Sequence, residues 1–376
     1  DTERYRLKNP KYFDEMLKLC LNCKRCEVAC PEGVKVGDII QAARIRYSTH
    51  KPSLRDMMLA NTDFVGGLAT AFAPIVNFSL GLGIMKKVLD SAFKIDKHRQ
   101  FPSYSHEKFE SWYKKHEAEQ VKYPHHVSYF HGCYANYNYP QLGKDFVKVM
   151  NAVGYGVNLL EKEKCCGVAL IANGLYSQAK RQGEININSM RDSVKDNEAV
   201  LTTSSTCTFT VRDEYKALLD INNDDVREKI SLATRFLYKL VETGKIKLAF
   251  RKDFKKKVAY HTACHMERMG WAIYSIELLK MIPGLELTVL ESCCCGIAGT
   301  YGFKKENYKN SQKIGALLFQ QIKEVNPEIV ATDCETCKWQ IEMSTGYKVE
   351  NPISLIAQAL DVEETKKLNN IEKQKL

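Results

Sequence analysis

Short apolar runs alternate with helical patterns from residue 125 onward, and this alternation predicts parallel strands joined by helices. The expected strands are Val127–Phe130, Val157–Leu160, Ala199–Thr203, Val258–Tyr260, Leu285–Leu290 and Ile329–Thr332. One expected helix begins at Pro140 and ends by Gly154, and a longer one runs from about Leu175 to Lys195. The pattern therefore predicts an α/β fold with mainly parallel sheets.

The chain before residue 125 has a different, mainly helical pattern. Lys11–Leu19 and residues 33–60 carry apolar positions at helical spacing, and residues 86–123 form a basic connector with an exposed helix over His106–Glu119. Phe64–Met85 contains no charged residue but includes four glycines and Pro74, which predict a pair of short helices. This apolar pair either lies in a membrane interface or packs against the protein itself or a partner.

Cysteines are the most informative residues, with 14 in 376 residues. Cys20, Cys23, Cys26 and Cys30, followed by Pro31, have the spacing of a bacterial ferredoxin motif. In such a motif the first three thiolates bind one [4Fe-4S] cluster and the fourth binds another. We therefore expect a further ferredoxin motif before Asp1 to complete both ligand sets. A zinc site rarely uses this spacing.

Five more cysteines can meet at one point near the C-terminal end, because they follow three successive expected strands. They are Cys264, Cys294, Cys295, Cys334 and Cys337. One zinc ion needs four ligands, whereas an iron-sulfur cluster has several irons and usually takes thiolates. Cys293 is expected to be a small buried residue. The neighbouring histidines, His131, His261 and His265, are expected to be structural, with tuning of a cluster as the alternative.

The same cysteine order occurs about 130 residues earlier, so the chain contains an internal repeat. Its ligands are Cys133, Cys165, Cys166 and Cys207, and Ser204 stands where the second copy has Cys334. Ile230–Leu232 and Ile353–Leu355 extend the apparent match. The four thiolates bind either an ordinary or a distorted cluster, or the first copy is a scaffold without one.

These patterns divide the chain into five segments. They are a ferredoxin-type segment (1–60), an apolar segment with its connector (61–124), a first cysteine-rich module (125–244), a second module (245–362) and a polar tail (363–376). The net charge of +10 suits anionic lipid or an acidic partner better than nucleic acid, because the basic stretches lack the aromatic and glycine pattern of RNA-binding sheets. We expect the many cysteines of a chain of this length to be reduced thiols in the cytoplasm, because disulfide-rich scaffolds are usually short and secreted.

Two copies of Cys, Cys-Cys-Gly and Cys-x-x-Cys behind a ferredoxin motif resemble the cysteine-rich CCG domain proteins. That family includes the B subunit of heterodisulfide reductase and the iron-sulfur subunits of glycolate oxidase and lactate-utilisation systems. The resemblance implies a non-cubane [4Fe-4S] cluster in the second module. It also offers an alternative function as a heterodisulfide-reductase-like or 2-hydroxy-acid-oxidase-type redox protein.

Several stretches, among them 22–31, 204–208, 295–306 and 333–342, are similar to a narrower branch, the C subunits of bacterial anaerobic glycerol-3-phosphate dehydrogenases. Ser204 belongs to that pattern. The resemblance implies a non-catalytic iron-sulfur subunit that passes electrons from the catalytic A and B subunits, which carry FAD or FMN, to menaquinone. It further implies peripheral binding to the cytoplasmic face of the inner membrane, and a quinone site near Phe64–Met85. A zinc-stapled interaction protein is the third, least favoured interpretation.

Overall fold

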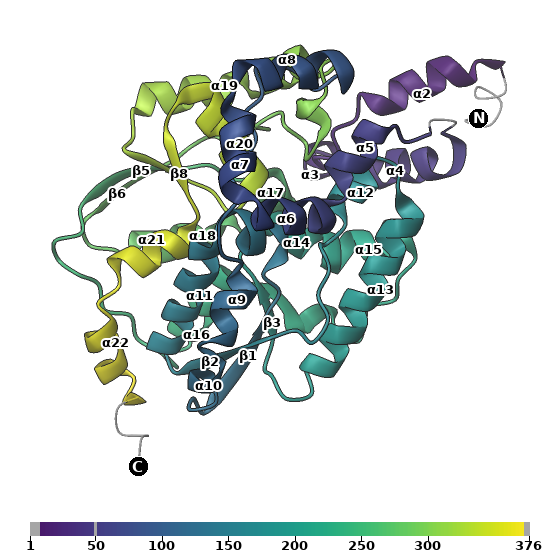
Figure 1. Ribbon diagram of the computed structural model, residues 1–376. Helices are drawn as coiled ribbons and strands as arrows, with labels where there is room; N and C mark the ends of the chain where they lie inside the picture. Colours follow the sequence, from purple (N-terminus) through teal and green to yellow (C-terminus); the bar gives the residue numbers. More distant parts are fainter. Residues whose placement is uncertain (1–7, 49–50, 372–376) are drawn as a thin grey trace.

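The computed structural model describes residues 8–48 and 51–371 (Figure 1). The ends of the expected first and last segments, residues 1–7 and 372–376, lie outside the described residues. So do residues 49–50 of the helical stretch expected over 33–60.

Two four-stranded parallel sheets form the centre of the described chain, with strand orders β2-β1-β3-β4 and β6-β5-β7-β8. The strands are β1 His125–Tyr129, β2 Tyr155–Leu159, β3 Val200–Thr202, β4 Ile230–Leu232, β5 Lys256–Tyr260, β6 Leu285–Val289, β7 Ile329–Ala331 and β8 Lys348–Glu350. The two sheets correspond closely: β1 pairs with β2 from His125↔Tyr155, and β5 with β6 from Lys256↔Leu285, each over five residues. The predicted α/β class with mainly parallel sheets is confirmed.

Strands β4 and β8 were not predicted, because β4 runs directly into helix α16 (Ala233–Glu242) and β8 has only one apolar residue, Val349. Their positions correct one part of the sequence repeat. Ile230–Leu232 forms β4, but Ile353–Leu355 lies inside helix α21, so the structural partner of β4 is β8. The match between the two Ile-Ser-Leu triplets is therefore wrong.

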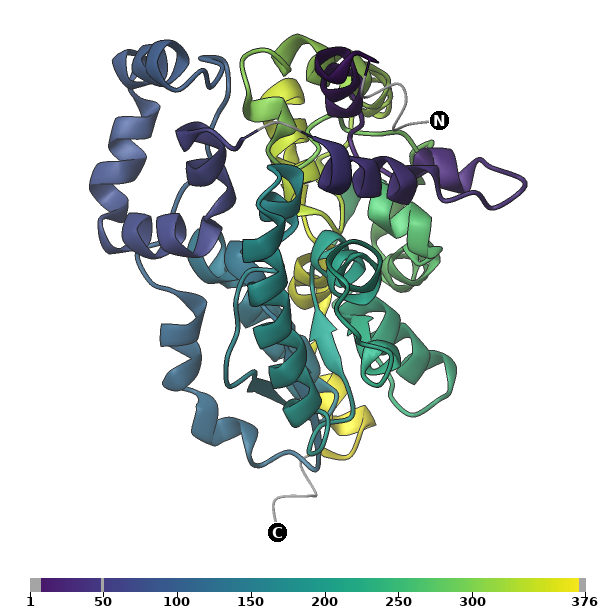
Figure 2. The same ribbon diagram turned by 90° about the vertical axis from the view of Figure 1, so that its right-hand side faces the viewer.

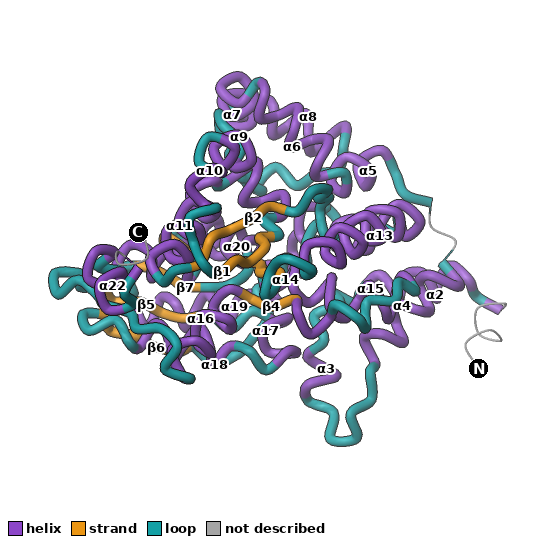
Figure 3. The backbone as a smooth tube through the Cα atoms, turned by 90° about the horizontal axis from the view of Figure 1, so that it is seen from below, coloured by secondary structure: helices purple, strands orange, loops and turns teal. Residues whose placement is uncertain are grey.

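Helices pack against both sheets (Figure 3), while the edge strand β6 lies at the outside of the molecule and has no fully buried residue. The first module contains α11 Pro140–Ala152, α12 Val168–Ala172, α13 Tyr176–Ser193, α14 Ser205–Phe209, α15 Tyr215–Leu219 and α16 Ala233–Glu242, with π-helices η1 Tyr134–Asn138 and η2 Thr210–Glu214 and a 3-10 turn η3 Arg227–Lys229. The second contains α17 Cys264–Met269, α18 Ala272–Lys280, α19 Tyr308–Val325, α20 Glu335–Thr345, α21 Pro352–Ala359 and α22 Val362–Leu368, with a 3-10 turn η4 Tyr301–Phe303. Pro140 and Pro352 stand in the first turns of α11 and α21, where a missing N–H costs nothing.

The two modules share one hydrophobic core. A single buried cluster includes Phe146 and Leu201 from the first module together with Tyr260 and Leu355 from the second. Helices α11 and α21 pack directly on each other across this boundary. The sheets are therefore held in a fixed relation, and the cysteine sites of the two modules lie near each other.

The N-terminal segments contain only helices among the described residues: α2 Pro10–Lys18, α3 Arg25–Val28, α4 Val36–Tyr47, α5 Leu54–Ala60, α6 Thr62–Ala71, α7 Ala73–Gly81, α8 Gly83–Ala92, α9 Phe109–Lys114 and α10 Glu117–Gln120. The single exposed helix expected over His106–Glu119 is wrong. Two short helices occupy that stretch, and Phe109 and Tyr113 are buried against the first module. Burial of these aromatic side chains holds the segment against the core.

The uncharged segment forms the bent arm seen at the left of Figure 2. Three helices, not two, cover it, and the breaks fall at Phe72 and Leu82, while Gly66 and Gly67 stay inside α6. No single described helix is long and apolar enough to cross a membrane. Helices α6 and α7 meet the length and composition criteria only as a pair bent by 103°.

Candidate metal centres

The predicted ligands of each module lie just beyond the carboxyl ends of its strands. In the first module, Cys133 follows β1, Cys165 and Cys166 follow β2, and Cys207 follows β3. In the second, Cys264 follows β5, Cys294 and Cys295 follow β6, and Cys334 and Cys337 follow β7. Because the carboxyl ends of parallel strands meet at one edge, this topology brings each set together.

The five thiols of the second module form a connected chain of contacts. Cys294 and Cys337 lie close to Cys295, and their thiols lower the pKa of Cys295 to about 5. Cys337, with help from Thr206 and Thr336, lowers the pKa of Cys334 to about 6. Burial raises the pKa of Cys264, and the charges of Cys294, Cys334 and Cys295 raise it further. Mutual repulsion of this kind makes an added cation favourable.

The first module brings its four predicted ligands together in the same way. The Sγ atoms of Cys133 and Cys165 lie 3.8 Å apart. Hydrogen bonds from Cys133 and then Cys166 lower the pKa of Cys165, while Cys166 also contacts Cys207. Among the described residues, no three Cys, His, Asp or Glu side chains are placed to hold a single metal ion. Thiolates are the usual ligands of iron-sulfur clusters, so the donor set of each module fits such a group.

Ser204 occupies the same backbone position as Cys334. Each is the N-cap residue of a helix, α14 or α20, with an extended backbone. The Ser204 hydroxyl accepts the N–H of Cys207 at 3.2 Å and donates to Glu335 Oε2 at 2.7 Å. Burial, followed by the charge of Cys334, raises the pKa of Glu335 to about 8. Ser204 thus caps a helix and binds a buried carboxyl of the other module.

The glycine after each Cys-Cys pair has a conformational role. Gly167 and Gly296 have φ angles of +85° and +86°, which side-chain-bearing residues rarely adopt. At Gly296 a Cβ would also lie 2.1 Å from the carbonyl oxygen of Ser311, whereas at Gly167 the nearest atom, in Ala179, would be 3.6 Å away. Close packing of α19 against the second motif therefore needs glycine there for two reasons.

The ferredoxin-type segment lies against the second module (Figure 1, near α3 and α17). Cys23 lies close to Cys294, and the Cys294 thiol raises the pKa of Cys23. Arg25 Nη1 donates to Glu267 at 2.7 Å and to Ser292 at 2.9 Å, and Glu27 pairs with Arg268 at 2.9 Å.

Within this segment, burial raises the pKa of Cys26, and the nearby charges of Cys20 and Cys23 raise it further. Among the described residues no hydrogen bond joins Cys30 to another thiol.

The histidines beside the ligands differ from one another. His131 is satisfied as expected: its ring contacts Glu163, Glu110 and the carbonyl of Gly132, and its pKa is raised to about 9 by Glu163 despite burial. His261 does not match the expectation of a satisfied structural residue. It is buried, yet neither ring nitrogen has a hydrogen-bond partner within the described chain, and burial lowers its pKa to about 4.

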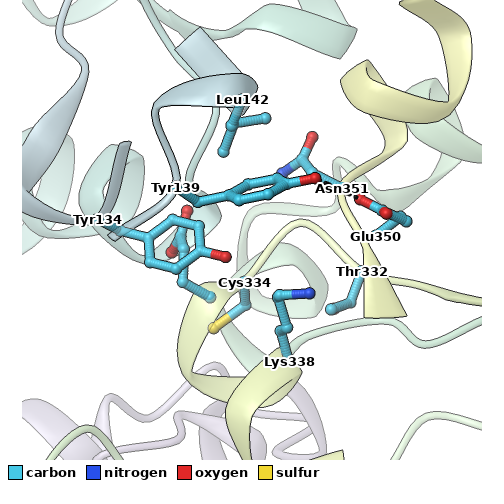
Figure 4. Close-up of a pocket in the computed structure, with 9 residues that line it drawn as sticks. Tyr134, Tyr139, Leu142, Thr332, Cys334, Lys338, Glu350 and Asn351 are labelled. Atoms are coloured by element: carbon cyan, nitrogen blue, oxygen red, sulfur yellow. Dashed lines mark hydrogen bonds between the residues drawn. The ribbon is translucent and has the colours of Figure 1, made fainter. Parts of the chain in front are cut away.

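A narrow pocket lies between the modules beside Cys334 (Figure 4). Tyr134 and Tyr139 from the first module face Cys334 and Lys338 from the second. The Tyr139 hydroxyl donates to Glu350 Oε2 at 3.4 Å. None of the pocket's lining residues comes from Phe64–Met85, so the quinone site expected there stays a prediction.

Sequence reasoning missed three residues that approach the cysteines from distant parts of the chain. Asp63 Oδ2 accepts the N–H of Cys165 at 2.8 Å, and burial next to Cys165 raises the pKa of Asp63 to about 6. Thr62 lies against the Cys165 thiol. Arg99, 2% exposed, donates to Gln340 and, at 2.8 Å, to Ser311 behind Gly296. The one sequence signal that could have identified Asp63 is its position as an acidic residue at the edge of the uncharged segment.

Comparison with known proteins agrees with this arrangement. Residues 127–212 and 258–342 match the CCG family, described as a cysteine-rich domain. The C subunit of anaerobic glycerol-3-phosphate dehydrogenase from Escherichia coli K12 is 56% identical over 361 residues, which is 96% of this chain and 91% of that protein. The chain belongs to this family of C subunits. It is thus an iron-sulfur subunit of a dehydrogenase complex, and the other subunits of the complex are its partners.

More distant relatives of this C subunit share part of its length. An uncharacterized iron-sulfur protein of Methanocaldococcus jannaschii is 30% identical over 63% of this chain and 44% of its own. Lactate utilization protein A 1 of Bacillus anthracis is 29% identical over 47% of this chain and 74% of its own. Among solved structures, glutamate racemase RacE1 of Bacillus anthracis covers 67% of this chain and 83% of its own at a TM-score of 0.30 and 9% identity, too low to carry an argument.

Proposed function

We propose that this C subunit transfers electrons in a membrane-associated anaerobic glycerol-3-phosphate dehydrogenase and is not itself catalytic. Its donors are the flavin-containing catalytic A and B subunits, and its acceptor is menaquinone. Cys20, Cys23, Cys26 and Cys30 bind clusters of the ferredoxin type, and the thiols of the second module bind a [4Fe-4S] cluster of the non-cubane type. When bound, such clusters supply one-electron redox chemistry.

One observation carries this proposal: Cys23 lies close to Cys294, whose thiol raises the pKa of Cys23. This contact joins a ferredoxin ligand to a ligand of the second module, although the two residues are far apart in the chain. The ion pairs of Arg25 with Glu267 and of Glu27 with Arg268 fix this contact from both sides. Neighbouring ligand sets held in a fixed relation are what a relay between donor and acceptor requires.

The chain also provides what thiolate ligands need. The backbone N–H groups of Asn22 and Gly296 donate to the sulfurs of Cys20 and Cys294, each at 3.4 Å. Such donors stabilise negative charge on sulfur. Burial of Cys295, Cys334 and Cys337 keeps water away from the second site. By contrast, the first module lacks a complete thiol set because Ser204 stands where the second module has Cys334, and the Ser204 hydroxyl is bonded to Glu335 instead. This argues against catalysis of the heterodisulfide type.

Helices α6–α8 are proposed to bind the cytoplasmic face of the inner membrane. Their surface carries large exposed apolar side chains, including Phe64 at 74%, Ile75 at 69% and Phe78 at 72%. Lys86 and Lys87 follow on α8, where they can meet anionic headgroups. An exposed apolar surface of this kind is typical of an interaction site, and delivery of electrons to a lipid-soluble quinone needs contact with the membrane.

Charging this surface tests the proposal. Replacing Leu68, Ile75 and Leu82 together with Asp should move the complex from the membrane to the soluble fraction. Activity with a soluble dye acceptor should persist, because the catalytic subunits are untouched. A matched control replaces Val121, Ile273 and Leu317, which are exposed elsewhere, with Asp. The control should stay on the membrane. If the variant with Asp at Leu68, Ile75 and Leu82 is folded and contains iron but stays on the membrane, helices α6–α8 do not anchor the complex.

A further inference from the structure

The first module has one thiol fewer than the second, and the missing donor is not supplied by the serine in its place. Ser204 directs its hydrogen to Glu335 and accepts the N–H of Cys207. Both interactions hold the serine as a helix cap and as a link between modules. This inference rests on the proposed function: four thiols are enough for an ordinary [4Fe-4S] cluster, but a cluster of the non-cubane type proposed for the second module needs a fifth donor, which must come from elsewhere in the chain.

The first turn of α6 is the element that reaches these thiols from outside the module. Asp63 Oδ2 accepts the N–H of Cys165 at 2.8 Å. The buried hydroxyl of Thr62 has no hydrogen-bond partner among the described residues apart from the Cys165 thiol. Two polar side chains from one helical turn thus meet the ligand that contacts both Cys133 and Cys166.

Packing holds α6 in this position along its length. Gly66 lies so close to the ring of Tyr137 that a Cβ would be 2.5 Å from it. Tyr137 belongs to η1, the π-helix that directly follows Cys133. In the next helix, α7, Asn77 accepts the N–H of Tyr104 at 2.9 Å and donates to its carbonyl at 2.8 Å. The helix therefore spans the site from Cys165 to the segment after Cys133.

We propose that Asp63 supplies the fifth donor of the first cluster site, through its carboxylate, in place of the thiol that Ser204 lacks. Thr62 then donates a hydrogen bond to the Cys165 thiolate. The site is completed by a helix from outside the module, and that helix also carries the exposed apolar side chains of Phe64 and Leu68.

The charge of Asp63 supports this assignment. Asp63 lies partly buried beside thiols that carry negative charge when they bind metal. Burial and the charge of Cys165 raise its pKa to about 6, although the charges of Lys164 and His131 oppose this. A carboxylate in such a place is unfavourable unless a cation compensates it. An iron ion accepts oxygen ligands as well as thiolates, so metal binding satisfies both the carboxylate and the thiol set.

The test uses the full natural chain, purified without oxygen in its complex, with iron and sulfide analysis and EPR spectra at graded reduction. Asp63→Asn keeps an oxygen that accepts the Cys165 N–H but removes the anionic donor. We expect it to lose one EPR species and about four irons per chain. Asp63→Cys should keep that species and shift it toward the second module's spectrum, because it creates five thiols. Asp192→Asn, on an exposed side chain of α13, is the matched control and should leave iron and spectra unchanged.

Three results would overturn the inference. Wild-type iron content and spectra in Asp63→Asn would mean that Asp63 only accepts the Cys165 N–H. Loss of the species in both variants would indicate a structural role for this position. A wild-type complex with ferredoxin-type and second-module signals but no third species would leave the proposed function intact and remove this site. Absence of iron from the wild type would instead contradict the proposed function.

Discussion

The two cysteine-rich modules have the same sheet topology but differ in what surrounds their cysteines. The second brings five thiols together and lies against the ferredoxin-type segment through Cys23 and Arg25. The first brings four together and lies against α6 through Asp63. Their helices differ as well. In the first module, one π-helix follows Cys133 and another follows α14, which contains Cys207. In the second module, Cys264 and Cys337 lie in regular α-helices.

This difference teaches that the fold fixes where donors are placed, while neighbouring segments decide how many there are and what they contact. π-helical turns often occur at functional sites, since one extra residue re-aims the side chains that follow. In the first module, η1 contacts α6, while η2 continues from α14, which contacts α17 of the second module. Thr206 Oγ1 lies 3.3 Å from Cys334 Sγ, so the two sites also touch each other.

The largest expected effect comes from removing equivalent ligands. Cys295→Ala should eliminate one EPR-visible species and about four irons per chain. Cys166→Ala, its counterpart, should eliminate a different species. The ferredoxin-type signal should persist in both variants, because separate ligand sets hold separate clusters. Cys293→Ala serves as control, since its thiol is buried beside Gln321 and outside both chains of contacts. Loss of every signal from one substitution would show that the modules are not independent sites.

A smaller difference is expected between the two glycines. Gly167→Ala should cost about 1–2 kcal/mol of stability, from its positive φ alone. Gly296→Ala adds a clash with the Ser311 carbonyl and should cost roughly 3–5 kcal/mol. Anaerobic thermal unfolding measures both.

Gly174→Ala provides the control for backbone strain without contact, since a Cβ there would meet no atom within 4 Å, and it should match Gly167→Ala. Equal unfolding midpoints for all three variants would mean that close packing of α19 does not distinguish the second module.

The smallest expected effect belongs to Ser204→Cys. Replacing the hydroxyl weakens the hydrogen bond to buried Glu335 and should cost about 1–3 kcal/mol. The new thiol should also shift the first module's spectrum toward that of the second, because it restores the soft ligand found at Cys334. Ser204→Ala separates the two effects, since it loses the hydrogen bond without adding a thiol. An unchanged spectrum in Ser204→Cys would indicate that position 204 is directed away from the thiol set.

The sequence predicted much of the fold because its signals are local. Short runs containing apolar residues marked β1, β2, β3, β5, β6 and β7, and Cys-Cys-Gly after β2 and β6 marked the two cysteine sets. The errors fall where local pattern is weak or misleading. Strand β4 runs directly into α16, β8 has one apolar residue, and the polar stretch 106–119 buries Phe109 and Tyr113 in the core. Identity of three letters aligned Ile230 with Ile353, although one lies in a strand and the other in a helix.

Cysteine spacing by itself determined the repeat and predicted the donor chemistry, and the apolar runs placed the cysteines after strands, because these signals depend on residues close together in the chain. Only the tertiary structure decided which segments meet those ligands. Cys165 receives Asp63 from 102 residues away, and Ser204 meets Glu335 across 131 residues. Such contacts follow from the packing of α6 on Tyr137 and from the core that both modules share. No local pattern encodes them, because they depend on the shapes of surfaces that exist only after folding.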